Sequence, residues 1–194
     1  MKKLLAILTL IFTLPTPSQA DDIRDFQIEG ISIGDSLLNY FSEEEINKNI
    51  RSEYYKNNKY TAIEFFSHPS FKVYDSVSFD VKTLDKNFII QALVGVLFTE
   101  SGSDCYEKQK QIDKELSIIF TNTKKNKNNK NHNADKTGKS KTKAINFWFK
   151  SSDLVTVICT DWSSDLTAKY RWSDNLSVEL KTKEYNDFLR YAFK

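Results

Sequence analysis

Residues 88–98 read Phe-Ile-Ile-Gln-Ala-Leu-Val-Gly-Val-Leu-Phe, an almost continuously apolar run of strand length. Such a run is typical of a strand that is buried on both faces of a sheet. Gly95 interrupts the run and predicts a β-bulge, because a glycine inside a strand often marks one. The stretch therefore predicts the central strand of a sheet, around which the other elements are expected to pack.

Shorter strands are expected on both sides of this run. Residues 60–66 are β-branched and aromatic, and Pro69 follows them, where proline lacks the amide donor that a sheet ladder needs. Alternation of apolar and polar side chains predicts four more strands. These strands cover residues 76–81, 145–149, 155–159 and 176–180.

Helices are predicted from capping residues and apolar stripes. One helix covers residues 101–121, and another covers residues 37–50 and restarts at Ser42, which has the capping-box spacing to Glu45. Thr182 is expected to cap a terminal helix. The long helix has Cys105, Ile112, Leu116 and Ile119 on one face, and the terminal helix has Tyr185, Phe188, Leu189 and Ala192 on its apolar face.

The segment 122–143 differs in composition from the rest of the chain. It contains eight Lys, one acid (Asp135) and no large apolar side chain. A segment that can bury nothing is expected to be a disordered, solvated loop. A role of this Lys run in attachment to anionic lipid or polysaccharide stays open.

These elements predict an α+β fold in one domain, residues 21–194. The expected order is helix, three strands, helix, long loop, three strands, helix. The expected architecture is a single, mostly antiparallel sheet of about six strands with helices on one face. The two halves, each of three strands and a helix, have no obvious residue identity, so they are not interpreted as a sequence repeat.

The first twenty residues have the three parts of a secretory signal peptide. Met1-Lys2-Lys3 precede an apolar run over residues 4–14, and the run is followed by residues 15–20, which end in Ser-Gln-Ala. Eleven apolar residues are too few to span a bilayer, which needs about 20. The sequence therefore predicts cleavage before Asp21, a secreted or periplasmic location, and no membrane span after cleavage.

The charge balance argues against one class of function. The chain has 28 basic and 26 acidic side chains, and Lys2 and Lys3 would be removed with the signal peptide. The processed chain is then formally neutral. A dedicated nucleic-acid-binding domain carries a basic face and a high pI, so no nucleic-acid partner is expected.

Cys105 and Cys159 are the two cysteines of the chain. An even number of cysteines in an exported protein favours a disulfide. Cys105 lies on the apolar face of the predicted long helix, and Cys159 shares a strand face with Val155 and Val157, so both thiols are expected to face the core. The alternative is a catalytic thiol at Cys105 paired with His68 or His132.

The segment 161–174 holds the best candidates for a ligand surface. Its predicted surface residues are Trp162, Tyr170, Trp172, Asp161 and Asp165, with Asp174 close by. Exposed tryptophan next to carboxylates is typical of sugar-binding surfaces, and paired carboxylates are the groups that glycosidases use. The favoured alternative is that the tryptophans fill the core between sheet and helices and that the aspartates occupy turns.

Other motifs are weaker. Residues 133–140 approach the phosphate-loop pattern, but Asn133 stands where the motif needs glycine and a strand is expected to follow. His132 and Asp135 alone lack the ligand spacing of a metal site. Residues 175–177 form a glycosylation sequon, relevant only in a host that glycosylates exported proteins. No catalytic, cofactor-binding or metal-binding residue and no cofactor are predicted.

Part of the sequence resembles a group of small exported proteins from AT-rich marine alphaproteobacteria. The similarity begins over residues 25–46, which include Gly30-Ile31-Ser32-Ile33-Gly34-Asp35-Ser36, and continues through residues 132–141 and Asp161-Trp162. It implies a bacterial periplasmic setting and transfers no functional residue, since no activity is assigned to the group. The Gly-Ile-x-x-Gly-x-Ser opening is also similar to envelope assembly lipoproteins of α+β type, although the cysteine for a lipid anchor is missing here.

The export signal, the missing catalytic cluster and the neutral domain predict a periplasmic binding or envelope-accessory domain without catalytic activity. Its expected partner is an envelope protein or a glycan. The alternative is a carbohydrate-active or other hydrolytic enzyme that uses the residues of segment 161–174.

Overall fold

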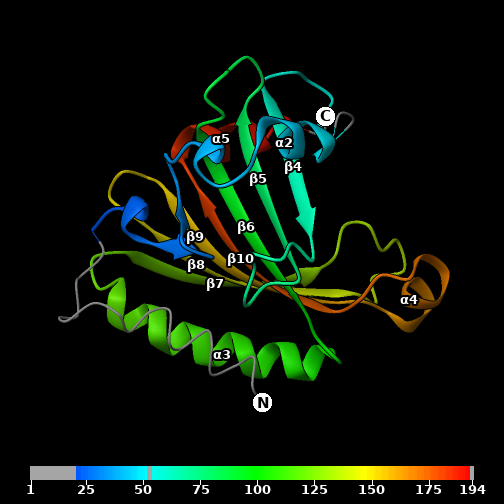
Figure 1. Ribbon diagram of the computed structural model, residues 1–194. Coiled ribbons are helices and arrows are strands. Elements are labelled where there is room, and N and C mark those ends of the chain that lie inside the picture. Colours follow the sequence, from blue (N-terminus) through cyan, green and yellow to red (C-terminus); the bar gives the residue numbers. More distant parts are fainter. Residues whose placement is uncertain (1–20, 52–53, 193–194) are drawn as a thin grey trace.

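The structure is a computed structural model that describes residues 21–51 and 54–192 (Figure 1). The predicted signal peptide lies outside the described residues. The N-terminal part contains η1 (Ile23–Asp25), β1 (Gln27–Ile28), β2 (Ile31–Ser32), η2 (Leu37–Asn39), α2 (Glu43–Lys48) and β3 (Ile50–Arg51). The middle contains β4 (Tyr60–Phe66), β5 (Ser76–Lys82), β6 (Ile90–Phe98) and α3 (Gly102–Ile119). The C-terminal part contains β7 (Lys124–Asn131), β8 (Lys141–Trp148), β9 (Leu154–Asp161), α4 (Ser164–Tyr170), β10 (Asn175–Lys181) and α5 (Lys183–Leu189).

The fold is α+β, and its main sheet has the order β3-β4-β5-β6-β10-β9-β8-β7, with every pairing antiparallel. The sheet is built from two meanders, β3 to β6 and β7 to β10, which join where β6 pairs with β10. Helix α3 connects the meanders by running from β6, in the middle of the sheet, to β7 at its far edge (Figure 1). Strands β1 and β2 form a separate two-stranded sheet.

Strand β6 occupies the central position that its apolar run predicts, between β5 and β10. The predicted bulge at Gly95 is wrong, because the register shifts instead between Asp80 and Val81 of the neighbouring strand. Gly95 has another role: a Cβ there would lie 2.7 Å from the ring of Tyr74. Glycine at this position therefore lets the tyrosine ring pack directly against the strand backbone.

The prediction of about six strands is wrong, because the main sheet has eight strands within the described residues. The segment 122–143, expected to be a disordered loop, instead forms β7, a turn and the start of β8. Every side chain of β7 is exposed, and the strand is held by its backbone ladder to β8. Lys125 and Lys127 also form ion pairs with Asp113 of α3, the second at 2.7 Å. An edge strand can form without any apolar residue when its backbone and its charges have partners.

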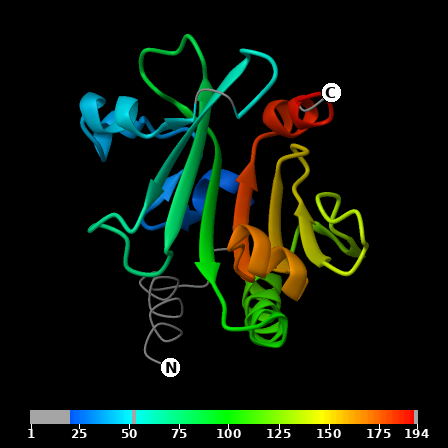
Figure 2. The same ribbon diagram turned by 90° about the vertical axis from the view of Figure 1, so that its right-hand side faces the viewer.

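The expectation of helices on one face is also wrong, because α3 and α5 lie on opposite faces of the sheet (Figure 2). Helix α3 packs on the large apolar core, which contains Ile63 and Leu93. Helix α5 packs on a smaller cluster that contains Ala62 and Ala92. Successive residues of a strand point to opposite faces. Ala62 and Ile63 are successive, as are Ala92 and Leu93, so the two helices pack on different sides of the sheet. We call these the α3 face and the α5 face.

The capping predictions are confirmed. Ser42 and Glu45 form the capping box of α2, and Thr182 caps α5 through a hydrogen bond from the backbone N–H of Tyr185. Helix α4 was not predicted from the sequence. In the described part of the chain, no helix is long and apolar enough to cross a membrane.

Candidate functional site

Four aromatic rings gather at one end of the sheet, and we call them the aromatic cluster. The rings of His132 and Trp162 lie 4.2 Å apart between centroids, and those of Trp162 and Trp172 lie 4.5 Å apart. The ring of Tyr170 stacks on Trp172 at 4.9 Å. The four side chains thus form one continuous row of rings.

The cluster is assembled from two distant parts of the chain. Trp162 directly follows β9, and His132 directly follows β7, so the antiparallel ladder that joins β7, β8 and β9 brings them to the same end of the sheet. Tyr170 is the last residue of α4, and Trp172 follows two residues later. Figure 1 shows α4 at one extremity of the molecule.

Local hydrogen bonds hold the segments that carry the rings. Asp135 is buried in the turn between β7 and β8, where it accepts hydrogen bonds from the backbone N–H groups of Thr137 and Ser140 at 2.8 Å each. The backbone N–H of Ser163, next to Trp162, donates to the Ser140 hydroxyl at 2.9 Å. The turn therefore supports the start of the α4 segment.

The rings lie outside both apolar cores of the described chain. Trp162 and Trp172 are half-buried, Tyr170 is 48% exposed, and α4 has no buried residue. The favoured interpretation that these tryptophans fill the core between sheet and helices is therefore wrong. The physical reason is position: the segment lies past the end of the strands, so its rings can pack mainly on one another.

The carboxylates of the segment have separate structural partners. Asp161 points to the α3 face, where its Oδ2 accepts a hydrogen bond from the hydroxyl of Tyr106 at 3.0 Å. Asp174 accepts one from the backbone N–H of Trp162 at 2.7 Å. Asp165 pairs with Lys139 at 2.8 Å, and both side chains are 63% exposed. The structure therefore brings Trp162, Tyr170 and Trp172 together, with Asp165 nearby on α4 and Asp161 turned away.

The aromatic cluster has a neutral histidine. Burial, aided by the nearby charge of Lys130, lowers the pKa of His132 below its usual value near 6.5. The imidazole is therefore uncharged at neutral pH and packs on Trp162 as a neutral ring.

A polar strip of the α5 face leads away from the cluster. The ladder places Lys130, Thr142, Thr160 and Asn175 in one row across β7, β8, β9 and β10. Two rows further along the same face, the ladder aligns Asn126, Asn146, Thr156 and Glu179 across the same four strands. The hydroxyls of Thr142 and Thr156 are buried and have no hydrogen-bond partner among the described residues. Both hydroxyls are enclosed within the fold and are not accessible at the surface.

A buried titratable group lies at the other end of the same face. Asp80 is 5% exposed, and the hydroxyl of Tyr55 donates a hydrogen bond to its Oδ1 at 2.7 Å. Tyr185 of α5 also contacts the Tyr55 hydroxyl. Burial raises the pKa of Asp80 from 3.8 to about 6, opposed by the tyrosine hydrogen bonds and by Lys181. This group fixes α5 to the sheet.

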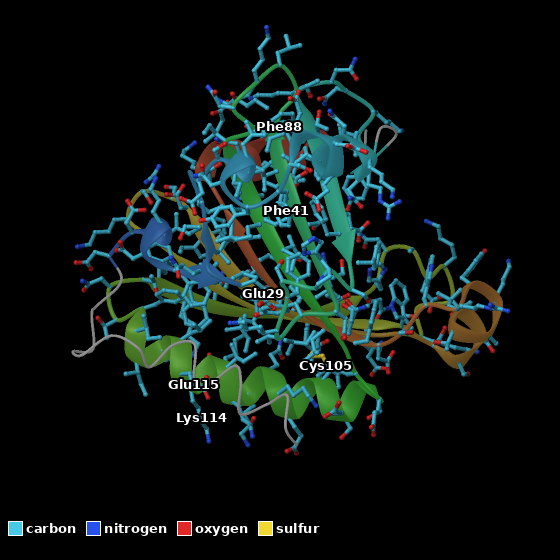
Figure 3. The ribbon with its side chains drawn as sticks, viewed as in Figure 1. Glu29, Phe41, Phe88, Cys105, Lys114 and Glu115 are labelled. Carbon is cyan, nitrogen blue, oxygen red and sulfur yellow. A yellow bond between two sulfur atoms is a disulfide. The ribbon has the colours of Figure 1, made fainter. Side chains whose placement is uncertain are left out.

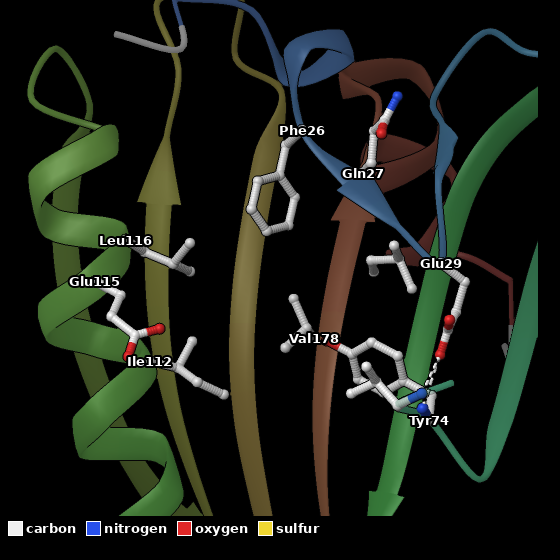
Figure 4. Close-up of a pocket in the computed structure, with 10 residues that line it drawn as sticks. Phe26, Gln27, Glu29, Tyr74, Ile112, Glu115, Leu116 and Val178 are labelled. Carbon is white, nitrogen blue, oxygen red and sulfur yellow. Dashed lines mark hydrogen bonds between the residues drawn. The ribbon is translucent and has the colours of Figure 1, made fainter. Parts of the chain in front are cut away.

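An apolar cavity of about 40 Å³ lies between α3, β1 and β10 (Figure 4). Glu29 at its edge accepts hydrogen bonds from the backbone N–H groups of Lys72, Val73 and Tyr74, the shortest at 2.7 Å. Ligand pockets typically enclose about 300–1,000 Å³. The cavity is therefore too small for a ligand, and Glu29 serves the packing of the N-terminal segment.

The other sequence candidates have structural roles. Cys105 and Cys159 form the predicted disulfide, so the catalytic-thiol alternative is wrong (Figure 3). The segment 133–140 forms the turn between two strands, without the helix of a phosphate loop. Among residues 21–51 and 54–192, no three His, Cys, Asp or Glu side chains are close enough to hold a metal ion.

Comparisons with protein families, characterised proteins and solved structures find no match to this chain. The geometry of the aromatic cluster and of the α5 face therefore has to indicate the function.

Proposed function

We propose that this protein is an exported, non-catalytic binding domain that holds a glycan on the aromatic cluster. The observation that carries the proposal is the row of four rings, packed outside the core and partly exposed. The C–H faces of a sugar are apolar and pack on aromatic rings, while its hydroxyls need hydrogen-bond partners. The rings supply the first, and Asn126 and Asn128, whose side chains are exposed on the same face of β7, supply the second.

The engaged carboxylates favour binding over hydrolysis. A glycosidase needs two carboxyl groups that flank one bond of the sugar chain. Here Asp161 and Trp162 point to opposite faces, and Asp174 is used to hold the backbone at Trp162. Asp165 is exposed and forms an ion pair with Lys139, so its carboxylate already has a cationic partner at the surface.

The proposed location is the periplasm or the extracellular space. The signal-peptide pattern of residues 1–20 supports export, and the Cys105–Cys159 disulfide is consistent with an oxidising compartment. The resemblance to exported alphaproteobacterial proteins supports a bacterial envelope, where the ligand would be an envelope glycan.

Replacement of Trp162 by alanine should weaken glycan binding about 10-fold, because the central ring contributes packing worth about 1–2 kcal/mol. Binding is measured as retardation in gels that contain dextran, xylan, soluble peptidoglycan fragments, polygalacturonate or dextran sulfate. Tyr191→Ala is the matched control, since Tyr191 is an aromatic residue, 65% exposed, outside the cluster.

Two results would contradict this proposal. One is that Trp162→Ala and the unmodified protein are retarded equally in each gel in which a polysaccharide slows either of them. The other is release of reducing ends by the unmodified protein that Asp165→Asn abolishes, which would restore the hydrolase alternative.

A further inference from the structure

The surroundings of the aromatic cluster are rich in exposed cations. Lys130 lies two residues before His132, and its charge contributes to the low pKa of that histidine. On the other side, the Nζ of Lys169 lies 4.8 Å from the centroid of the Tyr170 ring. Arg171, exposed, lies between Tyr170 and Trp172 in the chain. The row of rings is therefore flanked by positive charge from β7 and from α4.

The nearby acids do not balance this charge at the surface. Asp135 is buried within its turn, and Asp161 is directed to the α3 face. Asp174 is committed to the backbone N–H of Trp162. The exposed acid of the segment, Asp165, already has Lys139 as a partner. Lys130, Lys169 and Arg171 therefore have no carboxylate partner within salt-bridge distance in the described part of the chain.

The lysines of β7 have different partners on the two faces of the sheet. Lys125 and Lys127 point to the α3 face, where both form ion pairs with Asp113. Lys130 points to the α5 face, in the row that holds the buried, unpartnered hydroxyl of Thr142. The lysines of β7 are thus used structurally on one face and left free for a ligand on the face that carries the rings.

We infer that the glycan is an acidic polysaccharide, whose sugar rings pack on Trp162 and Trp172 while its anionic groups contact Lys130, Lys169 and Arg171. The inference rests on the proposed function and names the chemical class of its ligand. Carboxylate, sulfate and phosphate groups share the chemistry that ammonium and guanidinium groups recognise. A neutral glycan would offer these cations no anionic partner.

Single-stranded nucleic acid offers the same combination of stackable rings and negative charge. The formally neutral processed chain and the export signal favour the polysaccharide. A polynucleotide is therefore an outcome of the test rather than a second proposal.

The test uses two polymers, each in a charged and a neutral form. Affinity is measured in gels that contain polygalacturonate or its fully methyl-esterified form, and dextran sulfate or dextran. Binding to at least one charged polymer should be roughly 10-fold tighter than to its neutral counterpart and should weaken at high salt. The triple variant Lys130→Gln, Lys169→Gln, Arg171→Gln should lose that preference. The triple variant Lys86→Gln, Lys114→Gln, Lys150→Gln removes the same charge elsewhere on the exposed surface and should keep it.

The outcomes separate the two proposals. Equal affinity for charged and neutral polymers, lost in Trp162→Ala, would overturn the acidic ligand and leave the glycan-binding function standing. A preference that both triple variants retain, or lose equally, would also overturn the inference. Binding to none of the polymers would overturn both proposals, and tighter binding to oligothymidylate than to either charged polymer would replace the polysaccharide with a nucleic acid.

Discussion

Reduction of the Cys105–Cys159 disulfide should lower the melting temperature by about 10 °C. The bond joins α3 to β9 across a sequence separation of 54 residues, and both sulfur atoms lie in the fully buried core. Loop-entropy estimates give such a cross-link about 4 kcal/mol, and a domain of this size loses about 2–4 °C per kcal/mol. Differential scanning calorimetry with and without a reductant measures the effect.

Variants separate the cross-link from the packing of the sulfur atoms. The reduced protein keeps both side chains and loses only the bond, whereas Cys105→Ala and Cys159→Ala also lose packing and should melt no higher than the reduced protein. Two reactive thiols in the unreduced, denatured protein would show that the bond does not form and would contradict this expectation.

The second large effect is a pH dependence of the free energy of unfolding that comes from Asp80. Its folded-state pKa of about 6 exceeds the value of 3.8 for an unperturbed aspartate, so the folded protein binds more protons in this interval. The free energy of unfolding should therefore fall as the pH rises from about 4 to about 6, by about 3 kcal/mol for this group. Its stabilising effect is complete below the unfolded-state pKa and is lost above the folded-state pKa.

Urea denaturation of the unmodified protein and of Asp80→Asn isolates this contribution, because the other titrating groups are common to both. Asparagine can still accept the hydrogen bond from Tyr55, which lies 2.7 Å from Asp80. The variant should gain stability relative to the unmodified protein as the pH rises and should then level off above about pH 7. A stability difference that is independent of pH would mean that Asp80 does not titrate in this interval.

The sequence predicts those parts of the fold that a pattern of buried apolar residues marks. The run 88–98 predicts β6, and the apolar stripe of residues 101–121 predicts α3 and, with the face of Cys159, the disulfide. Strand β7 was missed because an edge strand buries no side chain and therefore leaves no apolar pattern. The opposite placement of α5 was missed because Ala62 and Ala92, which receive it, are small and do not mark a buried face.

Only part of the candidate site could be predicted from the sequence. Trp162, Tyr170 and Trp172 stand close together in the sequence and were predicted as a possible ligand surface. His132 was not assigned to that surface, because only the ladder from β7 through β8 to β9 brings it to Trp162. Recognition of β7 as a strand would have supplied the missing signal, since the alternation of side chains then places Lys130 and His132 on the face of Trp162.

The indole N–H resonances of the protein report directly on whether the aromatic cluster binds the glycan. The chain has three tryptophans, and Trp148 lies at the opposite end of β8 from the aromatic cluster. In nitrogen–proton correlation spectra, titration with the polysaccharide of the panel that binds most tightly should shift the Trp162 and Trp172 indole signals and leave the Trp148 signal in place. A bound polysaccharide that shifts only Trp148, or none of the three, would contradict the assignment of the aromatic cluster as the binding site.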